Sequence, residues 1–224
     1  MSSRDAILGK IRKSLGVTGE EPGRNANVDQ RLRAAPRGVI PARGQLPPAE
    51  RLDLFEAMAK KFSASVARVP RTDDVPAAIA DYLRQHNLPA AVRTGDDPRL
   101  AALPWSRTQV AVTRGRSYGD DPVSVSHALT GVAETGTLLL TSGANNPTTL
   151  NFLPETHIVV IDAADVVGDY ETAFDRLRAR DGKGVMPRAV NMITGPSRSG
   201  DIEQTIILGA HGPRSVHIVI VGEP

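Results

Sequence analysis

The sequence has 224 residues, of which 40% are hydrophobic and 23% are charged, with a formal net charge of +2 and no cysteine. This composition is typical of a globular protein and excludes a disordered or fibrous chain. The lack of cysteine excludes disulfides, thiol nucleophiles, cysteine-type zinc sites and thiolate-held iron–sulfur clusters within these residues. No apolar run approaches the about 20 residues of a membrane span, and the N-terminus lacks the features of a signal peptide, so we expect a cytoplasmic protein.

Residues 1–16 are predicted to form an N-terminal amphipathic helix, with Ser3 as its N-cap and Gly16 as its stop. Four apolar side chains fall on one face of this helix: Ile7, Leu8, Ile11 and Leu15. Such a face either packs on the protein's own core or docks on a partner. We favour the core, because amphipathic helices usually cover one.

Residues 17–48 form an arm that is rich in Pro, Gly and Arg and has no sustained hydrophobic period. We predict an irregular segment, which is either mobile or wrapped around the body or a neighbouring subunit. Residues 1–50 contain nine Lys or Arg against five Asp or Glu. Since aromatic residues do not alternate with these basic residues, we expect a solvated basic surface and no nucleic-acid partner.

Residues 49–224 show the alternation of strands and helices that is typical of an α/β domain. Strands are predicted at 90–93, 109–113, 137–141, 156–161, 188–194 and 216–221, and helices at 49–66, 73–86, 169–180 and 202–208. This order predicts an α/β fold with a mostly parallel sheet flanked by helices. Ligands of such sheets bind beyond the C-terminal ends of the strands, where we place three short segments.

The first segment is Ala133-Glu-Thr-Gly-Thr137, directly before an apolar strand. Thr135, Gly136 and Thr137 can direct hydroxyl and backbone donors at an anion or a carbonyl oxygen, and Glu134 can act as a base or an acceptor. The alternative is a tight turn whose glycine adopts a positive φ.

The second segment runs from Thr194 to Glu203. Exposed N–H groups at a helix start, together with Ser197 and Arg198, would bind a phosphate or carboxylate. Asp201 and Glu203 would repel an anion there, and could instead bind a cation or hold a partner loop. The alternative is a helix cap by Ser199 with acidic residues in the first turn.

The third segment is Gly209-Ala-His211-Gly-Pro213. His211 can act as a general acid or base, or it can make a structural hydrogen bond. His157, at the head of a predicted strand, has the same two interpretations. The sequence contains no zinc-protease, phosphate-loop, nucleophile-elbow or dinucleotide-binding motif.

Four motifs in this order resemble the lactate-utilisation protein C family, also called the LUD or YkgG-like domain. They are Ala133-Glu-Thr-Gly-Thr, Leu153-Pro-Glu-Thr-His-Ile, Gly195-Pro-Ser-Arg-Ser-Gly-Asp-Ile-Glu and His211-Gly-Pro. The helix over residues 7–16 is similar to the opening helix of that family. The resemblance extends over nearly the whole chain, and its loosest part is the arm at 17–48.

The resemblance implies a fold related to the NagB/RpiA/CoA-transferase group, in a LUD-type domain at residues 49–224. It also implies a role in oxidising L-lactate to pyruvate beside two partner proteins that carry iron–sulfur clusters, with this chain as the non-redox subunit or accessory protein. The alternative is a small-molecule-binding protein or enzyme that acts on a carboxylate, a sugar phosphate or a CoA ester. We expect no metal or cofactor bound by this chain alone.

The expected pocket has two walls, one from each of the first two segments. Glu134 and His211 are the candidate catalytic residues. The candidate ligand-binding residues are Thr135, Gly136, Thr137, Ser197, Arg198, Asp201 and Glu203.

Overall fold

The computed structural model describes residues 2–182, 184–202 and 205–224. The chain divides into two compact units, residues 1–40 and residues 41–224.

The first unit contains two helices, α1 (Ser3–Leu15) and α2 (Pro22–Ala34). Helix α1 begins with a capping box, in which the Ser2 hydroxyl accepts the Asp5 N–H and the Asp5 carboxylate accepts the Ser2 N–H. Gly16 ends α1 at φ +62°. The predicted helix is therefore present, with Ser2 rather than Ser3 as its N-cap.

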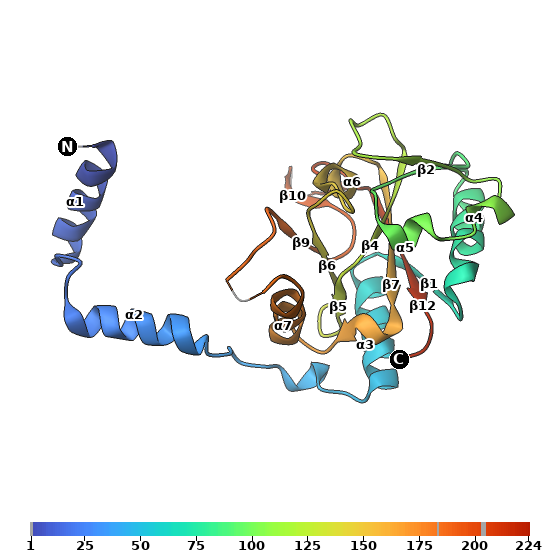
Figure 1. The fold of residues 1–224 in the computed structure, drawn as a ribbon. Helices are drawn as coiled ribbons and strands as arrows, with labels where there is room; N and C mark the ends of the chain where they lie inside the picture. Colours follow the sequence, from blue (N-terminus) through green and yellow to red (C-terminus); the bar gives the residue numbers. More distant parts are fainter. Residues whose placement is uncertain (1, 183, 203–204) are drawn as a thin grey trace. The chain divides into compact units, whose positions relative to one another are not determined.

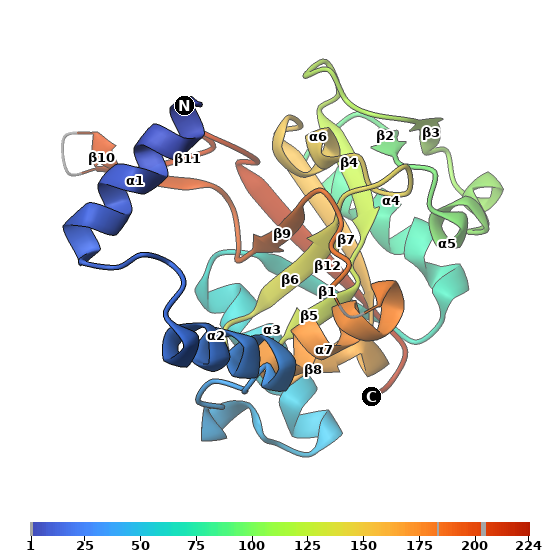
Figure 2. The same ribbon diagram turned by 60° about the vertical axis from the view of Figure 1, so that its left-hand side comes forward.

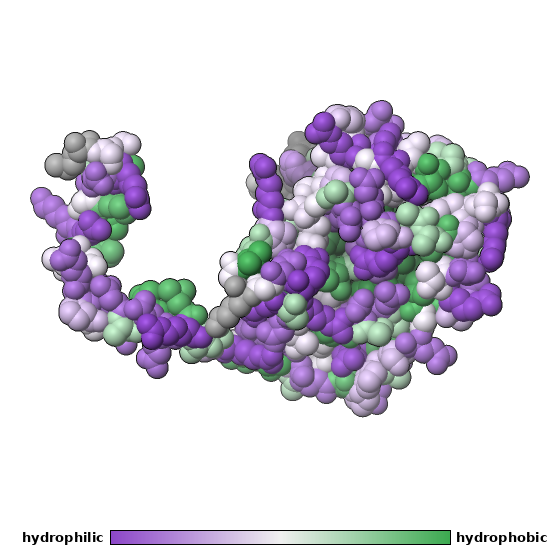
Figure 3. Space-filling model, viewed as in Figure 1, coloured by the Kyte–Doolittle hydropathy of each residue, from purple (hydrophilic) through white to green (hydrophobic). Residues whose placement is uncertain are grey.

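Helix α2 lies where the sequence predicts an irregular arm, and this expectation is wrong. Pro22 stands in the first turn, where its missing N–H costs nothing, and Ala35 ends the helix in a left-handed conformation. No hydrophobic period marks the segment, because its apolar residues are few. No residue of α1 or α2 is buried, and hydrophobic residues gather on one side of each helix (Figure 3).

A six-stranded parallel sheet forms the centre of the second unit, in the order β1-β12-β7-β4-β2-β3 (Figure 1). Its strands are β1 (Ser65–Val69), β2 (Ala91–Thr94), β3 (Ala111–Arg114), β4 (Val123–His127), β7 (Thr156–Asp162) and β12 (Ser215–Val221). Strands β7 and β12 are near-continuous apolar runs, as expected for strands buried on both faces. The predicted α/β fold with a mostly parallel sheet is confirmed.

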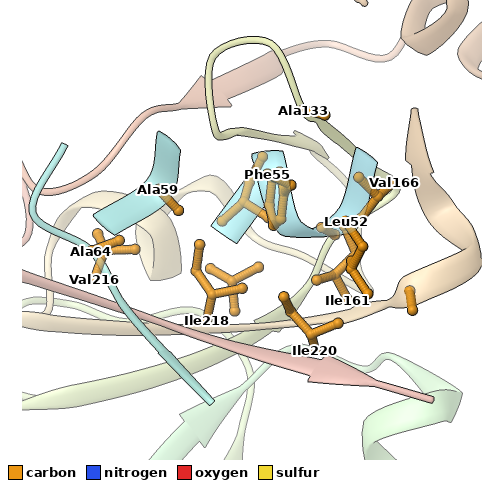
Figure 4. Packing of buried hydrophobic residues seen from close by; sticks show 14 of the residues in the cluster. Leu52, Phe55, Ala59, Ala64, Ala133, Ile161, Val166, Val216, Ile218 and Ile220 are labelled. Atoms are coloured by element: carbon orange, nitrogen blue, oxygen red, sulfur yellow. The ribbon is translucent and has the colours of Figure 1, made fainter. Parts of the chain in front are cut away.

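Helices cover both faces of this sheet. On one face, Leu52, Phe55 and Ala59 of α3 (Pro48–Lys61) pack against β7 and β12 (Figure 4). On the other face, α4 (Val75–Gln85) and α5 (Pro98–Ala101) pack against the alternate residues of the same strands, Val160 and Val219 among them. Alternate side chains of a strand point to opposite faces, so each central strand contributes to two cores.

A second sheet has the order β8-β5-β6-β9 and packs with α3 in the first core (Figure 2). Its strands are β8 (Val166–Val167), β5 (Thr130–Val132), β6 (Thr137–Thr141) and β9 (Val190–Ile193). Asp169 caps α7 (Tyr170–Asp181), which lies against this sheet. Short helical segments fill the connections: η1 (Ala42–Gly44), η2 (Thr72–Asp74), η3 (Trp105–Arg107), α6 (Thr148–Phe152) and η4 (Ala163–Asp165).

Two predicted helices differ from the structure. The helix predicted over 202–208 is wrong, because β10 (Arg198–Ile202) pairs antiparallel with β11 (Thr205–Leu208). A run of β-branched residues favours a strand there over a helix. The helix predicted over 49–66 ends at Lys61, and the edge strand β1 follows. Across the described ranges, no helix combines the length and apolar character of a membrane-crossing segment.

Candidate functional site

The three segments singled out by the sequence lie in one region, but not at the expected edge of the sheet. Residues 133–137 form the turn of the β5–β6 hairpin, 194–198 follow β9, and 209–213 lead into β12. Strand β9 is antiparallel to β6 in the second sheet. The region therefore lies near the beginning of β12, and the expectation that these segments follow the C-terminal ends of parallel strands is wrong.

Four hydroxyl groups join the first segment to the second. The Thr137 hydroxyl lies 2.8 Å from that of Thr135, 2.9 Å from that of Tyr170 and 2.7 Å from that of Thr194. Thr137 is fully buried, and its partners come from three different parts of the chain. This network ties the β5–β6 turn to the end of β9 and to the start of α7.

Glu134 and Gly136 are held by other contacts. The Glu134 side chain is buried, and its Oε2 lies 3.7 Å from Nε of Arg43. Gly136 has φ +66°, and a Cβ there would stand 2.4 Å from the backbone nitrogen of Ala59 in α3. The turn is therefore packed tightly against α3, and Glu134 does not line the cavity described next.

The second and third segments are joined by hydrogen bonds around Ser197. Its N–H donates to the Pro213 carbonyl at 2.9 Å, its carbonyl accepts the Gly209 N–H at 3.0 Å, and its hydroxyl accepts the His211 N–H at 3.3 Å. Gly195, at φ +68°, packs against the Phe62 carbonyl at the end of α3. The two loops thus form one structure.

These loops line an open surface cavity of about 200 Å³, which we call the loop cavity. Its lining residues are Asn151, Phe152, Met192, Ile193, Thr194, Gly195, Ser197, His211, Gly212, Pro213 and Val216. Ser197 and His211 are thus brought to one cavity, as the sequence predicts for neighbouring loops. Whether they bind a ligand stays a prediction.

A buried polar chain lies behind the loop cavity, and sequence reasoning named only its His157. His157 Nε2 is 3.0 Å from the Ser126 hydroxyl, which donates to Asn151 Oδ1 at 3.3 Å. Burial lowers the pKa of His157 to about 3, so the imidazole is neutral at neutral pH. The structure therefore favours the second interpretation of His157, a structural hydrogen bond.

Arg198 does not line the loop cavity. It donates to the Ser63 hydroxyl beside the end of α3, and Asp201 belongs to strand β10. Glu203 lies outside the described residues. Within the described ranges, no cluster of three or more His, Asp or Glu side chains is arranged to hold a metal ion.

A second cavity, of about 230 Å³, lies at the C-terminal edge of the parallel sheet, and we call it the edge cavity. His127 ends β4, Asp162 ends β7 and Val221 ends β12, and all three line it together with Arg99 after β2 and Thr72 after β1. Sequence reasoning missed this cavity, because no strand was predicted at 123–127 and His127 stands in no motif.

These features define an α/β protein built on an open parallel sheet, with cavities at both edges. The family model described as LUD domain matches residues 52–221. The chain belongs to the LUD-domain family, as the four sequence motifs indicate.

Relatives extend the comparison. The chain is 28% identical to an uncharacterized protein of Neisseria meningitidis, over 99% of this chain and 94% of that protein. It is 34% identical to proteins named lactate utilization protein C from Geobacillus thermodenitrificans and Bacillus subtilis, over 56% and 41% of this chain. These two alignments span 60% and 39% of the relatives' own lengths.

One solved structure has a similar fold. The crystal structure of a DUF162 family protein from Deinococcus radiodurans matches with a TM-score of 0.58 at 22% identity. The match covers 79% of this chain and 99% of that chain. At this identity the likeness supports the fold alone.

Proposed function

We propose that this protein takes part in lactate utilisation. In this proposal it is a non-redox subunit or accessory protein of an iron–sulfur-dependent system that oxidises L-lactate to pyruvate. The observation that carries the proposal is membership of the LUD-domain family, together with the similarity to proteins named lactate utilization protein C. The partners in this proposal are the proteins that hold the iron–sulfur clusters.

The side-chain chemistry of the chain supports this division of labour. Oxidation of lactate to pyruvate removes two electrons and two protons from the alcohol group, and the electrons need an acceptor. Iron–sulfur clusters are held by cysteine thiolates, and these 224 residues contain none. The clusters would therefore belong to the partners, and this chain would contribute binding and positioning.

The loop cavity favours a second candidate function, a small-molecule-binding protein or enzyme that acts on a carboxylate, a sugar phosphate or a CoA ester. Ser197 and His211 come from two loops that are hydrogen-bonded to each other, and they line this cavity with Asn151. A cavity of about 200 Å³ has room for about six non-hydrogen atoms, since a water molecule occupies about 30 Å³ of liquid.

Deletion of the gene for this chain tests the first proposal. We expect the deletion strain to lose growth on L-lactate as sole carbon source, to grow normally on pyruvate, and to recover when the intact gene is returned. Growth on pyruvate is the control, because it bypasses only the oxidation step. Unchanged growth of the deletion strain on L-lactate would contradict the proposal.

A further inference from the structure

We propose that the edge cavity binds a small 2-hydroxy carboxylate, with His127 accepting the hydrogen bond of its hydroxyl group and Arg99 holding its carboxylate. The ligand class follows from the groups that line the cavity. The choice of L-lactate within this class rests on the proposed function. No residue of the edge cavity belongs to the motifs that the sequence singles out.

One ring nitrogen of His127 is held by the backbone, and the other lies near Asp162, which also lines the cavity. His127 Nδ1 lies 2.9 Å from the Ala128 carbonyl. A carbonyl oxygen only accepts, so Nδ1 carries the proton of the neutral ring. Nε2 is then an acceptor with a free lone pair. His127 lines the cavity, and its side chain is only 5% exposed.

The surroundings of His127 keep the ring neutral. Burial and the charge of Arg99 lower its pKa, against the opposing effects of the Ala128 carbonyl, Asp162 and Asp97. Asp162 Oδ2 lies 3.6 Å from Nε2. This distance is too long for a hydrogen bond. His127 Nε2 and Asp162 Oδ2, both acceptors, therefore lie near each other without a hydrogen bond between them. A ligand hydroxyl bound beside them would donate its proton to one of them.

Arg99 supplies the positive charge of the cavity, and the Asp162 carboxylate supplies a negative charge beside it. It is oriented by Asp97, which is 2% exposed and accepts from Nε at 3.0 Å and from Nη2 at 2.7 Å. This bidentate pairing uses two of the three guanidinium nitrogens and leaves Nη1 for another acceptor. Since the Arg99 side chain is 48% exposed, a carboxylate can approach it from solvent.

Apart from Thr72 and Asp162, the rest of the lining is apolar and fits the hydrocarbon part of a short ligand. It is formed by Leu100, Ala102, Leu103, Val160 and Val221. The volume of about 230 Å³ corresponds to about seven or eight water molecules. The edge cavity thus offers two acceptors, His127 Nε2 and the Asp162 carboxylate, one cation, Arg99, and an apolar wall. A 2-hydroxy carboxylate would place its hydroxyl at the acceptors, its carboxylate at Arg99 and its short alkyl group on the apolar wall.

Titration calorimetry of the full chain with four probes tests the inference. We expect L-lactate to bind saturably, and propionate, which lacks the hydroxyl, and L-lactamide, which lacks the carboxylate, to bind about tenfold more weakly. L-alanine carries an ammonium group instead of the hydroxyl. Equal or tighter binding of L-alanine would overturn the hydroxy-acid assignment, and so would an absence of L-lactate binding.

Variants assign the contacts. His127→Gln should abolish the preference for L-lactate over propionate, and Arg99→Gln should abolish the preference for L-lactate over L-lactamide. His86→Gln, at an exposed histidine of the same unit, is the control and should keep both preferences. If a variant does not fold, the four probes on the native chain still decide, because propionate and L-lactamide test the hydroxyl and carboxylate contacts without any substitution. A variant that folds and retains its preference overturns the assigned contact.

The outcomes separate this inference from the proposed function. A deletion strain that fails to grow on L-lactate, combined with a chain that binds none of the probes, overturns the edge-cavity site and leaves the role in lactate utilisation intact. If the chain binds L-lactate but its deletion leaves growth on L-lactate unchanged, the edge-cavity site stands and the proposed role in lactate utilisation is overturned.

Discussion

Replacing Gly136 by alanine should lower the free energy of unfolding by about 3 kcal/mol or more. Two costs add at this position. The φ of +66° places a side chain in the left-handed region, at about 1–2 kcal/mol. The new Cβ would also stand 2.4 Å from the Ala59 nitrogen and 2.6 Å from the Met58 carbonyl carbon. Both are backbone atoms of α3 and cannot rotate away, so the turn or the helix must shift.

Urea denaturation of the Gly136→Ala variant and the native chain measures this loss. Gly143→Ala is the matched control, because a methyl group added there would meet no atom within 4 Å apart from its chain neighbours, and its φ is not positive. We expect the control to change stability by less than about 0.5 kcal/mol. A loss below about 1 kcal/mol at Gly136 would show that the turn does not pack on α3 as described.

Acidification from pH 6.5 to pH 4.5 should destabilise the protein by about 5 kcal/mol through two buried histidines. Burial lowers the pKa of His157 to about 3 and that of His217 to about 4. Unfolded histidine titrates near 6.5. Between these values the unfolded state binds more protons than the folded state, so stability is full above pH 6.5 and falls as the pH falls toward 4 and 3. His127 acts in the same direction.

Unfolding free energies measured at several pH values test this expectation. The same measurements on His157→Gln show how much of the pH dependence comes from His157. Glutamine keeps a donor for the Ser126 hydroxyl but has no proton to gain in this range. The slope of stability against pH between 4.5 and 6.5 should therefore decrease by about 1.4 kcal/mol per pH unit. An unchanged slope would mean that His157 is not the buried neutral residue that the structure shows.

The strongest sequence signals predicted the central elements of the fold. The apolar runs at 156–161 and 216–221 are long enough, and rich enough in Val and Ile, to be recognised as strands buried on both faces. The alternation with helices then favours a parallel sheet. Strand β1 was missed because the apolar period of α3 continues past Lys61 with no glycine or proline to end it.

The segment at 202–208 was misread because its local signals conflict. A serine cap at Ser199 followed by the acidic Asp201 and Glu203 is typical of a helix start, but the run Thr205-Ile-Ile-Leu208 favours a strand. Pairing with β10 decides in favour of the strand. Such pairing depends on which segment lies alongside, and a single segment cannot show it.

The sequence indicated the loops of the candidate site better than their chemistry. The glycines at 136 and 195 mark real turns with positive φ, but both pack against the backbone of α3 and its end. Asn151 and His127 were missed, since neither stands in a pattern that differs from ordinary helix or strand sequence. Their importance arises from tertiary neighbours: Ser126 and His157 for Asn151, and Asp162 and Arg99 for His127.

Gentle affinity purification of the chain from its native cells grown on L-lactate tests the central claim most directly. The material should co-purify with iron–sulfur proteins, show their brown visible absorption and reduce a dye in the presence of L-lactate, and this activity should disappear when the chain is stripped away. Undiminished lactate-dependent dye reduction by the partners after the chain is removed would contradict a role for it in the oxidising system.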